Sequence, residues 1–317
     1  MNVSLLVHLF LQVALPILIL VAAGALWPRY HRELSPDVLR MQLSRLALYL
    51  FAPALTFSAV AGQHLTAAVW SIPLLMIAGT LPVGLILYVV LYRTRVGAHL
   101  SNPTRAALMV AGMFGNTFFI GFPVLTFLYG PEGSRYTIFA DSVGSTPLVW
   151  SLGVWIAAHL GSEGRGRHGP EHFARTFFRL PPVWAFWVAL LVNWTGWDVS
   201  ALIHATHLIG QATVPVMMFV LGLSIPWRAL KPSKPILAAA ALKLLVLPAL
   251  VMGLAWLFFR PLGEAQQAVI LEGAMPTMLM ALVLSDQFGL DTEVVALTIG
   301  WSTLLFWVTL PVWLVWT

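Results

Sequence analysis

Two stretches of the sequence decide its fold: GMFGNTFFIGFP at residues 112–123 and EGAMPT at residues 272–277. Each places glycine and proline in the middle of a long apolar run, where a transmembrane helix would otherwise continue. Pro123 and Pro276 cannot donate a backbone hydrogen bond to the carbonyl four residues earlier. The freed carbonyls find no partner in lipid, so they must face protein, water or a ligand. We therefore expect a broken helix at each stretch.

The composition around these stretches is that of a membrane protein. The chain has 317 residues, of which 59% are hydrophobic and 9% are charged, and its mean hydropathy is +0.87. Soluble domains are roughly 45–50% apolar and about 25% charged. The 17 Lys and Arg residues give a net charge of +5 but form no basic run, so we expect no nucleic-acid partner. The absence of cysteine excludes disulfides, thiolate nucleophiles and cysteine-ligated metals.

Long apolar runs separated by Gly, Pro and charged residues predict ten transmembrane spans. The expected spans are 4–27, 38–60, 67–92, 104–129, 136–160, 180–194, 201–226, 235–259, 265–287 and 292–316. The longest hydrophilic stretch, 161–179, lies between the fifth and sixth spans and is expected to be a cytoplasmic connecting loop. It divides the chain into two five-span halves, 1–160 and 180–317.

The positions of Lys and Arg predict the orientation. If the N-terminus is outside, thirteen of the 17 lie on the inner side, Arg135 and Arg260 lie on the outer side, and Arg45 and Lys243 lie within spans. Positive residues are concentrated in cytoplasmic loops. We therefore expect both termini outside, in a multi-pass protein of the plasma or inner membrane.

An odd number of spans gives the two halves opposite orientations. If the halves share a fold, they form an inverted repeat, which is typical of secondary transporters. Prolines recur in matching order: Pro53 with Pro215, Pro82 with Pro248, and Pro123 with Pro276. The turns before spans five and ten also match, since Tyr-Gly-Pro-Glu at 129–132 corresponds to Phe-Gly-Leu-Asp at 288–291.

A half-helix that begins at a break directs free N–H groups and the positive end of its dipole at the midplane, which suits a carboxylate. Two inverted copies bring two such ends to one site. We therefore expect an organic anion to bind between the breaks. The candidate substrate-binding residues are Asn116, Thr117, Pro123, Ser145, Thr146, Met275, Pro276 and Thr277. Asn116 and Thr117 can also cap a half-helix, a role compatible with substrate contact.

Three charged residues inside the spans are candidates for coupling or charge balance, because an ionisable group at this depth needs a partner or a function. Glu272 precedes Pro276 by one turn and is a candidate for binding a coupling H⁺ or Na⁺, or for pairing with Lys243. Asp141 lies one turn before Ser145 and Thr146, so the three side chains are expected on one helix face, although solvation near the outer surface is the alternative. Lys243 offsets substrate charge or pairs with an acidic residue.

At these residues the sequence resembles the auxin efflux carrier family, which includes bacterial permeases for malate, malonate and related anions. The resemblance is carried by Phe51-Ala52-Pro53-Ala54-Leu55-Thr56-Phe57, Gly115-Asn116-Thr117 through Gly121-Phe122-Pro123 to Tyr129-Gly130, Pro215 with Phe219 and Gly222, Lys243 through Pro248, and Met275-Pro276-Thr277 followed by Phe288-Gly289. It covers nearly the whole chain.

The resemblance implies an all-α polytopic membrane protein with ten helices in two inverted five-helix repeats. Helices four and nine are broken and cross, as in the fold of bile-acid symporters and antiporters. It implies elevator-type movement against a scaffold made of spans one, two, six and seven, whose helices offer a face for a homodimer. It also implies a small organic anion, auxin-like or a dicarboxylate. The connecting loop is shorter than in many plant carriers, and Thr146 stands where those carriers tend to have Gln.

Other classes of protein are weighed against a carrier. An enzyme is not expected, because the sequence has no His-Glu-x-x-His, Gly-x-Ser-x-Gly, Walker or aspartate-rich metal motif. His204 and His207 have no third metal ligand at suitable spacing, so we expect no metal site and no cofactor. A cation/proton antiporter would show adjacent aspartates at the midplane, and the sequence has none. An anion sensor on a carrier fold and a sodium-coupled symporter of the bile-acid type remain as alternatives.

Overall fold

The computed structural model describes residues 8, 10–31, 33, 35–61, 67–161, 181–225, 227, 231 and 233–317. Within these residues seven helical stretches are long and apolar enough to cross a membrane. They are Leu11–Tyr30, Pro36–Ala61, Ser71–Arg93, Pro131–Gly161, Ser200–Ser224, Lys234–Phe258 and Thr292–Trp316. The prediction of a helical polytopic membrane protein is confirmed. The expected spans 104–129, 180–194 and 265–287 contain shorter helices. The expected connecting loop at 161–179 lies outside the described residues except for Gly161.

The α-helices follow one another along the chain with short interruptions. They are α2 (Leu15–Tyr30), α3 (Pro36–Leu46), α4 (Ala52–Ala61), α5 (Ser71–Tyr88), α6 (Asn102–Met113), α7 (Phe122–Tyr129), α8 (Pro131–Phe139), α9 (Thr146–Leu148), α11 (Pro181–Thr195), α12 (Ser200–Gly210), α13 (Thr213–Ser224), α14 (Lys234–Ala241), α15 (Leu247–Phe258), α16 (Glu264–Gly273), α17 (Met280–Phe288) and α18 (Thr292–Trp316). One 3-10 turn, η3 (Ala67–Trp70), precedes α5. The π-helical turns are η1 (Phe10–Ala14), η2 (Ala47–Phe51), η4 (Val89–Arg93), η5 (Thr117–Gly121), η6 (Ala140–Ser145), η7 (Val149–Gly153), η8 (Ile156–Gly161) and η10 (Leu242–Val246).

Five of the π-helical turns end two residues before a proline. Turns η1, η2, η5, η6 and η10 precede Pro16, Pro53, Pro123, Pro147 and Pro248. Proline lacks an N–H, and its ring clashes with the carbonyl four residues earlier in an α-helix. A π-turn moves the hydrogen bonding to the fifth residue and relieves that clash locally. The spans therefore widen or bend at these prolines and remain helical.

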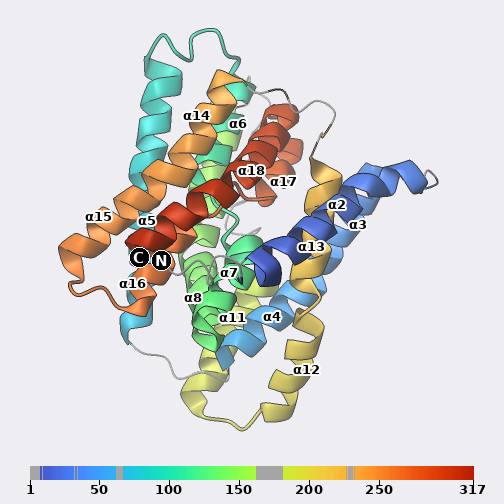
Figure 1. Cartoon of the computed structure of the whole chain (residues 1–317), viewed down its shortest axis with the longest axis vertical. Coiled ribbons are helices and arrows are strands. Elements are labelled where there is room, and N and C mark those ends of the chain that lie inside the picture. The colour runs from blue at the N-terminus through green and yellow to red at the C-terminus, as the bar shows by residue number, and fades with distance from the viewer. Residues whose placement is uncertain are drawn as a thin grey trace.

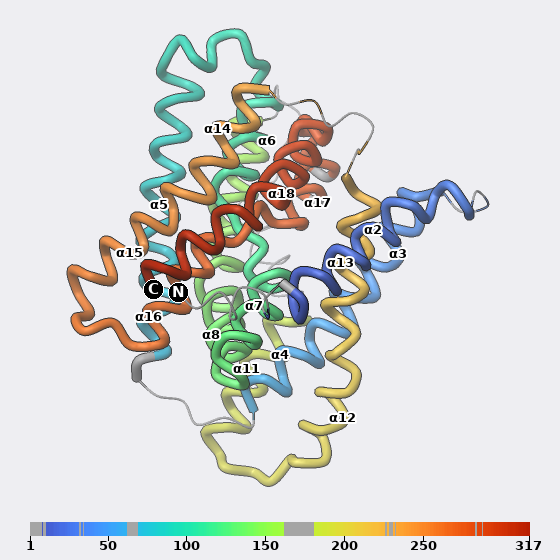
Figure 2. The backbone as a smooth tube through the Cα atoms, viewed as in Figure 1, coloured from blue at the N-terminus to red at the C-terminus, as the bar shows by residue number. Residues whose placement is uncertain are grey.

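The helices form two groups, which are visible in Figures 1 and 2. In the first group α2 packs against α13, α3 packs against α13, and α4 packs against α11 and α12. Helices α2 and α13 approach closely because both carry glycine at the contact. A Cβ on Gly24 would lie 2.1 Å from the carbonyl oxygen of Phe219, and a Cβ on Gly222 would lie 2.0 Å from that of Val21. Small residues at such contacts allow close helix approach in membranes.

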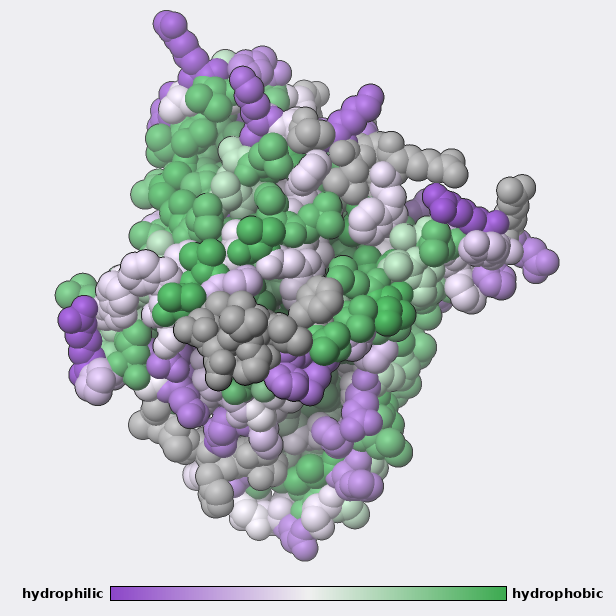
Figure 3. All heavy atoms as spheres, viewed as in Figure 1, coloured by the Kyte–Doolittle hydropathy of each residue, from purple (hydrophilic) through white to green (hydrophobic). Residues whose placement is uncertain are grey.

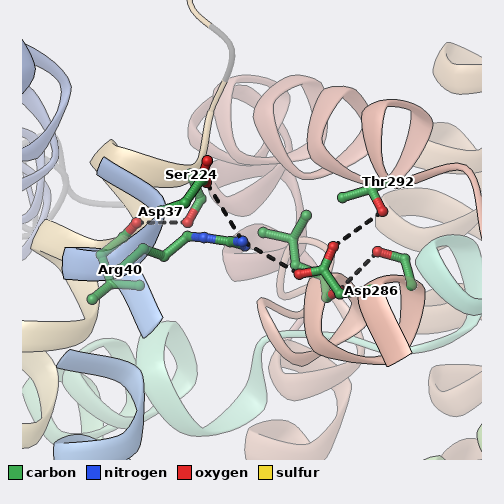
Figure 4. Close-up of polar contacts among 8 residues, drawn as sticks. Asp37, Arg40, Ser224, Asp286 and Thr292 are labelled. Carbon is green, nitrogen blue, oxygen red and sulfur yellow. Dashed lines mark hydrogen bonds and ion pairs between the residues drawn. The ribbon is translucent and has the colours of Figure 1, made fainter. Parts of the chain in front are cut away.

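The second group contains α5, α6, α7, α8, α14, α15, α16, α17 and α18. Here α5 packs against α15, α14 and α6 pack against α18, and α16 packs against α8 and α15. An ion pair joins the two groups, since the guanidinium of Arg40 on α3 lies 3.3 Å from the carboxylate of Asp286 on α17 (Figure 4). Thr292, at the start of α18, donates a hydrogen bond to the same carboxylate at 3.2 Å. Ser224, the last residue of α13, lies beside Arg40 in this view.

The outer surface carries many large apolar side chains, which suits contact with lipid. Leu257 on α15 is 73% exposed, and Trp194 on α11 is 86% exposed. Figure 3 shows apolar residues gathered over the flanks of both helix groups. Because lipid tails are as apolar as these side chains, such exposure carries no penalty in a bilayer.

Candidate functional site: the crossover of two broken helices

Both expected helix breaks are present. Helix α6 ends at Met113, Phe114 has extended backbone (φ −105°, ψ 128°), and helical structure resumes at Thr117. In the second half α16 ends at Gly273 and α17 begins at Met280. The break in each half therefore lies at the glycine-rich segment that the sequence marked.

The two breaks lie side by side. Gly115 and Thr277 form an antiparallel bridge, although the two residues are far apart in the sequence. Two hydrogen bonds join the segments, from the N–H of Asn116 to the carbonyl of Pro276 (2.6 Å) and from the N–H of Met278 to the carbonyl of Phe114 (3.1 Å). Polar groups freed by the breaks thus find partners in each other, as they must where lipid offers none.

Pro123 was expected within the break of the first half, but it lies inside a helix. The break in the first half lies at residues 114–116, and Pro123 lies at the second position of α7, in a helix that continues from Thr117. The π-turn η5 accommodates the proline, so it ends no helix there. Pro276 does lie within its break. The two prolines that matched in the sequence therefore differ in structural role.

Three of the expected binding residues, Met275, Pro276 and Thr277, are buried within the break between α16 and α17. Thr277 donates through its hydroxyl to the carbonyl of Ala111 at 2.9 Å, and its N–H donates to the hydroxyl of Ser302 at 3.0 Å. Met275 is fully buried. Neither these two residues nor Pro276 and Pro123 line a described pocket beside the crossover.

A pocket lies beside the crossover. Four of the expected binding residues line it: Asn116, Thr117, Ser145 and Thr146. Its other lining residues are Gly115, Phe118, Phe119, Asp141, Val149, Trp150, Met278, Leu279 and Met280. Both half-helices that start after the breaks begin at this pocket, one at Thr117 and one at Met280.

A second pocket shares part of this wall and reaches the first helix group. Its lining residues are Leu48, Ala52, Phe118, Phe119, Asp141, Thr146, Trp150, Pro182, Val183 and Met280. The site therefore lies where the two helix groups meet. Phe118, Phe119 and Trp150 were not among the expected binding residues. Their signal in the sequence is that Phe118 and Phe119 directly follow Asn116 and Thr117.

Asn116 has an unusual hydrogen-bonding state. Its side chain is buried, 3% exposed, and its Nδ2 has no hydrogen-bond partner among the described residues. The wall of the pocket also carries Asp141, whose two carboxylate oxygens accept from the hydroxyl of Thr117 at 2.8 Å and from that of Thr146 at 3.0 Å. The side chains of Asp141 and Thr146 thus lie together, as their spacing predicted.

Glu272 and Lys243 lie behind the crossover and line neither pocket. Both are fully buried, and their charges interact. Glu272 accepts from the hydroxyl of Thr137 at 2.7 Å, and its carboxylate lies against Gly121, where a Cβ would come within 2.4 Å of Oε2. Lys243 donates to the carbonyl of Gly273 at 2.7 Å, which places a cation at the negative end of α16.

Known proteins support a transport role for this architecture. A family model described as membrane transport protein matches residues 9–314. The chain is 33% identical to an uncharacterized transporter of Methanothermobacter thermautotrophicus over 278 residues, which cover 86% of this chain and 87% of that one. It is 24% identical to the uncharacterized transporter MJ1031 of Methanocaldococcus jannaschii over 282 residues, covering 86% and 87% of the two chains. With the uncharacterized transporter YfdV of Escherichia coli it shares 26% identity over 201 residues, covering 62% and 63%. The chain is therefore a transporter and not an enzyme, and it belongs to the membrane transport protein family, which is that of the auxin efflux carriers.

Proposed function

We propose that the protein carries a small organic anion across the cell membrane and binds its carboxylate beside the crossover. The observation that carries this proposal is the buried, unpartnered Nδ2 of Asn116 at the wall of the pocket. A buried N–H donor without an acceptor costs about 1–3 kcal/mol, so a ligand that supplies an acceptor is favoured there. A carboxylate supplies it.

The start of each half-helix supports the same ligand. The first backbone N–H groups of a helix have no partner within the helix, and the dipole makes that end positive. Helical structure from Thr117 to Tyr129 begins at the pocket, and so does α17 at Met280. Two positive ends that converge on one pocket favour an anion over a cation.

The remainder of the pocket favours an anion with an apolar body. Six residues line both pockets: Phe118, Phe119, Trp150 and Met280 form an apolar wall, and Asp141 and Thr146 are the two polar residues beside it. A dicarboxylate such as malate or malonate would place its second charge against that wall, where nothing would solvate it. An auxin-like monocarboxylate with an aromatic body fits better, and the dicarboxylate is the second candidate.

The proposed architecture is two inverted five-helix repeats, with both termini outside. The helix contacts support it, because exchange of the halves replaces α2 by α11, α4 by α13, α6 by α16 and α8 by α18. The contact of α2 with α13 then becomes that of α11 with α4, and the contact of α6 with α18 becomes that of α16 with α8; all four contacts are present. Gly130 and Gly289 lie at corresponding turns, both with positive φ (60° and 65°).

The position of the pocket supports an elevator-type mechanism. The binding residues belong to the second helix group, and the apolar wall continues into α11 and the α4 segment of the first group. Movement of one group past the other would carry the anion while its carboxylate stays bound to Asn116. The first group would then act as the scaffold.

The test is thermal unfolding of the detergent-purified protein with indole-3-acetate, phenylacetate, malate, malonate and a bile acid, each with and without Na⁺. A ligand at 100 times its Kd stabilises the folded state by about 2.7 kcal/mol. We expect stabilisation by the aromatic monocarboxylates, its loss in Asn116→Ala, and its retention in Asn102→Ala, a control at the exposed start of α6.

Other outcomes would change the proposal in defined ways. Stabilisation by malate alone would select the dicarboxylate, and a shift that needs Na⁺ or a bile acid would select the symporter. An unchanged shift in Asn116→Ala would place the carboxylate elsewhere. Binding without uptake into proteoliposomes would indicate a sensor on a carrier fold.

A further inference from the structure

The anion pocket contains a negative charge of its own. Asp141 lines both pockets, and no Lys, Arg or His lines either of them within the part of the chain that the structure describes. A substrate carboxylate at Asn116 would therefore share a largely apolar, partly open pocket with the carboxyl group of Asp141, and no cationic side chain of the described residues would contact it.

The surroundings of Asp141 offer no counter-charge. Its turn, η6, packs against α5, α8, α9, η5 and α11, all of which are fully described. The charged or titratable residues of these elements are Tyr88 on α5 and Glu132, Arg135 and Tyr136 on α8. Arg135 forms an ion pair with Glu132 on its own helix. What reaches Asp141 is a pair of threonine hydroxyls.

Two further charged groups lie behind the crossover. Glu272 lines neither pocket, and its carboxylate accepts from the hydroxyl of Thr137 at 2.7 Å. Lys243 donates to the carbonyl of Gly273 at 2.7 Å and also lines neither pocket, so its ammonium makes no direct contact with a carboxylate there.

We propose that Asp141 binds a proton when the anion binds, so that the protein transports anion and proton together. Two carboxylates that share one largely apolar pocket disfavour each other's ionised form, so one of them takes up a proton. The step adds H⁺ from solvent to one Oδ of Asp141 and breaks no other bond. A monoanion plus this proton adds no net charge to the moving helix group. The inference rests on the proposed function.

The hydrogen bonds around Asp141 tolerate both protonation states. A threonine hydroxyl donates one hydrogen bond and also accepts, and it rotates to suit its partner. With Asp141 ionised, Thr117 and Thr146 donate to it, as observed. With Asp141 protonated, one hydroxyl rotates and accepts, or the new O–H donates to the substrate carboxylate. The site therefore binds the proton without a rearrangement of the backbone.

The experiment measures proton uptake on ligand binding. Full-length protein in weakly buffered detergent solution is mixed with indole-3-acetate, and a pH-sensitive dye reports the protons bound, while calorimetry reports the anion bound. We expect uptake of about one proton per bound anion at pH 7. Asp141→Asn should bind indole-3-acetate with no proton uptake, and Asp286→Asn, which removes an exposed carboxylate outside the pocket, should keep the wild-type ratio.

A second variant covers the case in which Asp141→Asn loses binding. Thr146→Val removes one hydrogen-bond donor to the ionised carboxylate and so disfavours the ionised form. The pH range over which anion binding takes up a proton should therefore lie higher than in wild type. An unchanged pH range in Thr146→Val would overturn the assignment to Asp141. Binding of indole-3-acetate to wild type without proton uptake would overturn the inference and leave the proposed function standing. Absence of binding by any of the tested organic anions, malate and malonate included, would overturn both.

Discussion

The N–H of Asn116 donates to the carbonyl of Pro276 at 2.6 Å, and this bond joins two helix breaks from opposite halves of the chain. Its counterpart runs in the other direction, from Met278 to Phe114 at 3.1 Å. The two bonds flank the antiparallel bridge between Gly115 and Thr277. The crossover thus has local twofold character, and it fixes both half-helix ends at one pocket.

Gly115 lies in this crossover with no room for a side chain. A Cβ there would lie 2.8 Å from Cε and Nζ of Lys243, which is held by the carbonyl of Gly273. We expect Gly115→Ala to displace the ammonium and to lower the free energy of unfolding by about 1–3 kcal/mol. Gly253→Ala on α15 is the control, because a Cβ there meets nothing within 4 Å and alanine favours a helix by up to about 1 kcal/mol. Thermal unfolding in detergent measures both, and equal midpoints for the two variants would contradict this account.

Lys243 and Glu272 should depend on each other for stability. Removal of one member of a buried charge pair leaves the other uncompensated and costs about 3–5 kcal/mol. We expect Lys243→Met to destabilise strongly, and Lys243→Met combined with Glu272→Gln to recover part of the loss, because no unpaired charge then remains. The measurement is a double-mutant cycle of thermal unfolding. Additive losses would mean that the two residues act separately.

Trp150 should select for anions with an aromatic body. It is 7% exposed and lines both pockets. Loss of one aromatic contact costs about 0.5–1.5 kcal/mol beyond the buried area, so Trp150→Ala should weaken indole-3-acetate binding on the order of tenfold. Acetate, which lacks the ring, is the control ligand and should change little. Equal losses of affinity for the two ligands would show that Trp150 maintains the shape of the pocket and does not contact the aromatic ring of the ligand.

The ion pair between Arg40 and Asp286 allows a test of relative movement between the helix groups. The protein has no cysteine, so Arg40→Cys with Asp286→Cys introduces the only two thiols. We expect a short bis-maleimide across this pair to stop anion uptake into proteoliposomes and to leave anion binding intact. Loss of the surface ion pair itself should cost at most about 1 kcal/mol.

A matched pair within the second helix group is the control for this cross-link. The hydroxyl of Thr104 on α6 donates to Asp291, the N-cap of α18, at 2.8 Å. Replacing Asp291 by cysteine removes the N-cap of α18, at a cost of about 1 kcal/mol. A cross-link between positions 104 and 291 joins two helices of the same group, which should move together. Uptake that stops equally in both cross-linked proteins would argue against movement between the groups.

Much of the fold follows from local sequence. Glycine and proline within an apolar run predicted the breaks, because lipid cannot satisfy freed backbone groups, and both breaks are present. The positions of the prolines alone did not show at which of them a helix bends and at which it ends. Pro123 follows a π-turn and stays helical, whereas Pro276 lies in the non-helical segment between α16 and α17.

The candidate site was only partly predictable. Asn116, Thr117, Ser145 and Thr146 were identified, because polar residues are rare at this depth and these lie next to a break or on one helix face. Thr277 was expected at the pocket, but its hydroxyl donates to the carbonyl of Ala111 and its N–H donates to the hydroxyl of Ser302. Its spacing in the sequence gave no indication of which side of the crossover it faces.

The sequence by itself determined that this chain lies in a membrane, that it is helical and that two of its helices break at mid-depth, since burial in lipid and proline chemistry act locally. The tertiary structure decided which polar groups meet. It placed the unpartnered amide of Asn116 and the carboxylate of Asp141 on one pocket, and it placed Lys243 and Glu272 behind the crossover. Such contacts join residues far apart in the chain, so they depend on how the helices pack and not on any one segment.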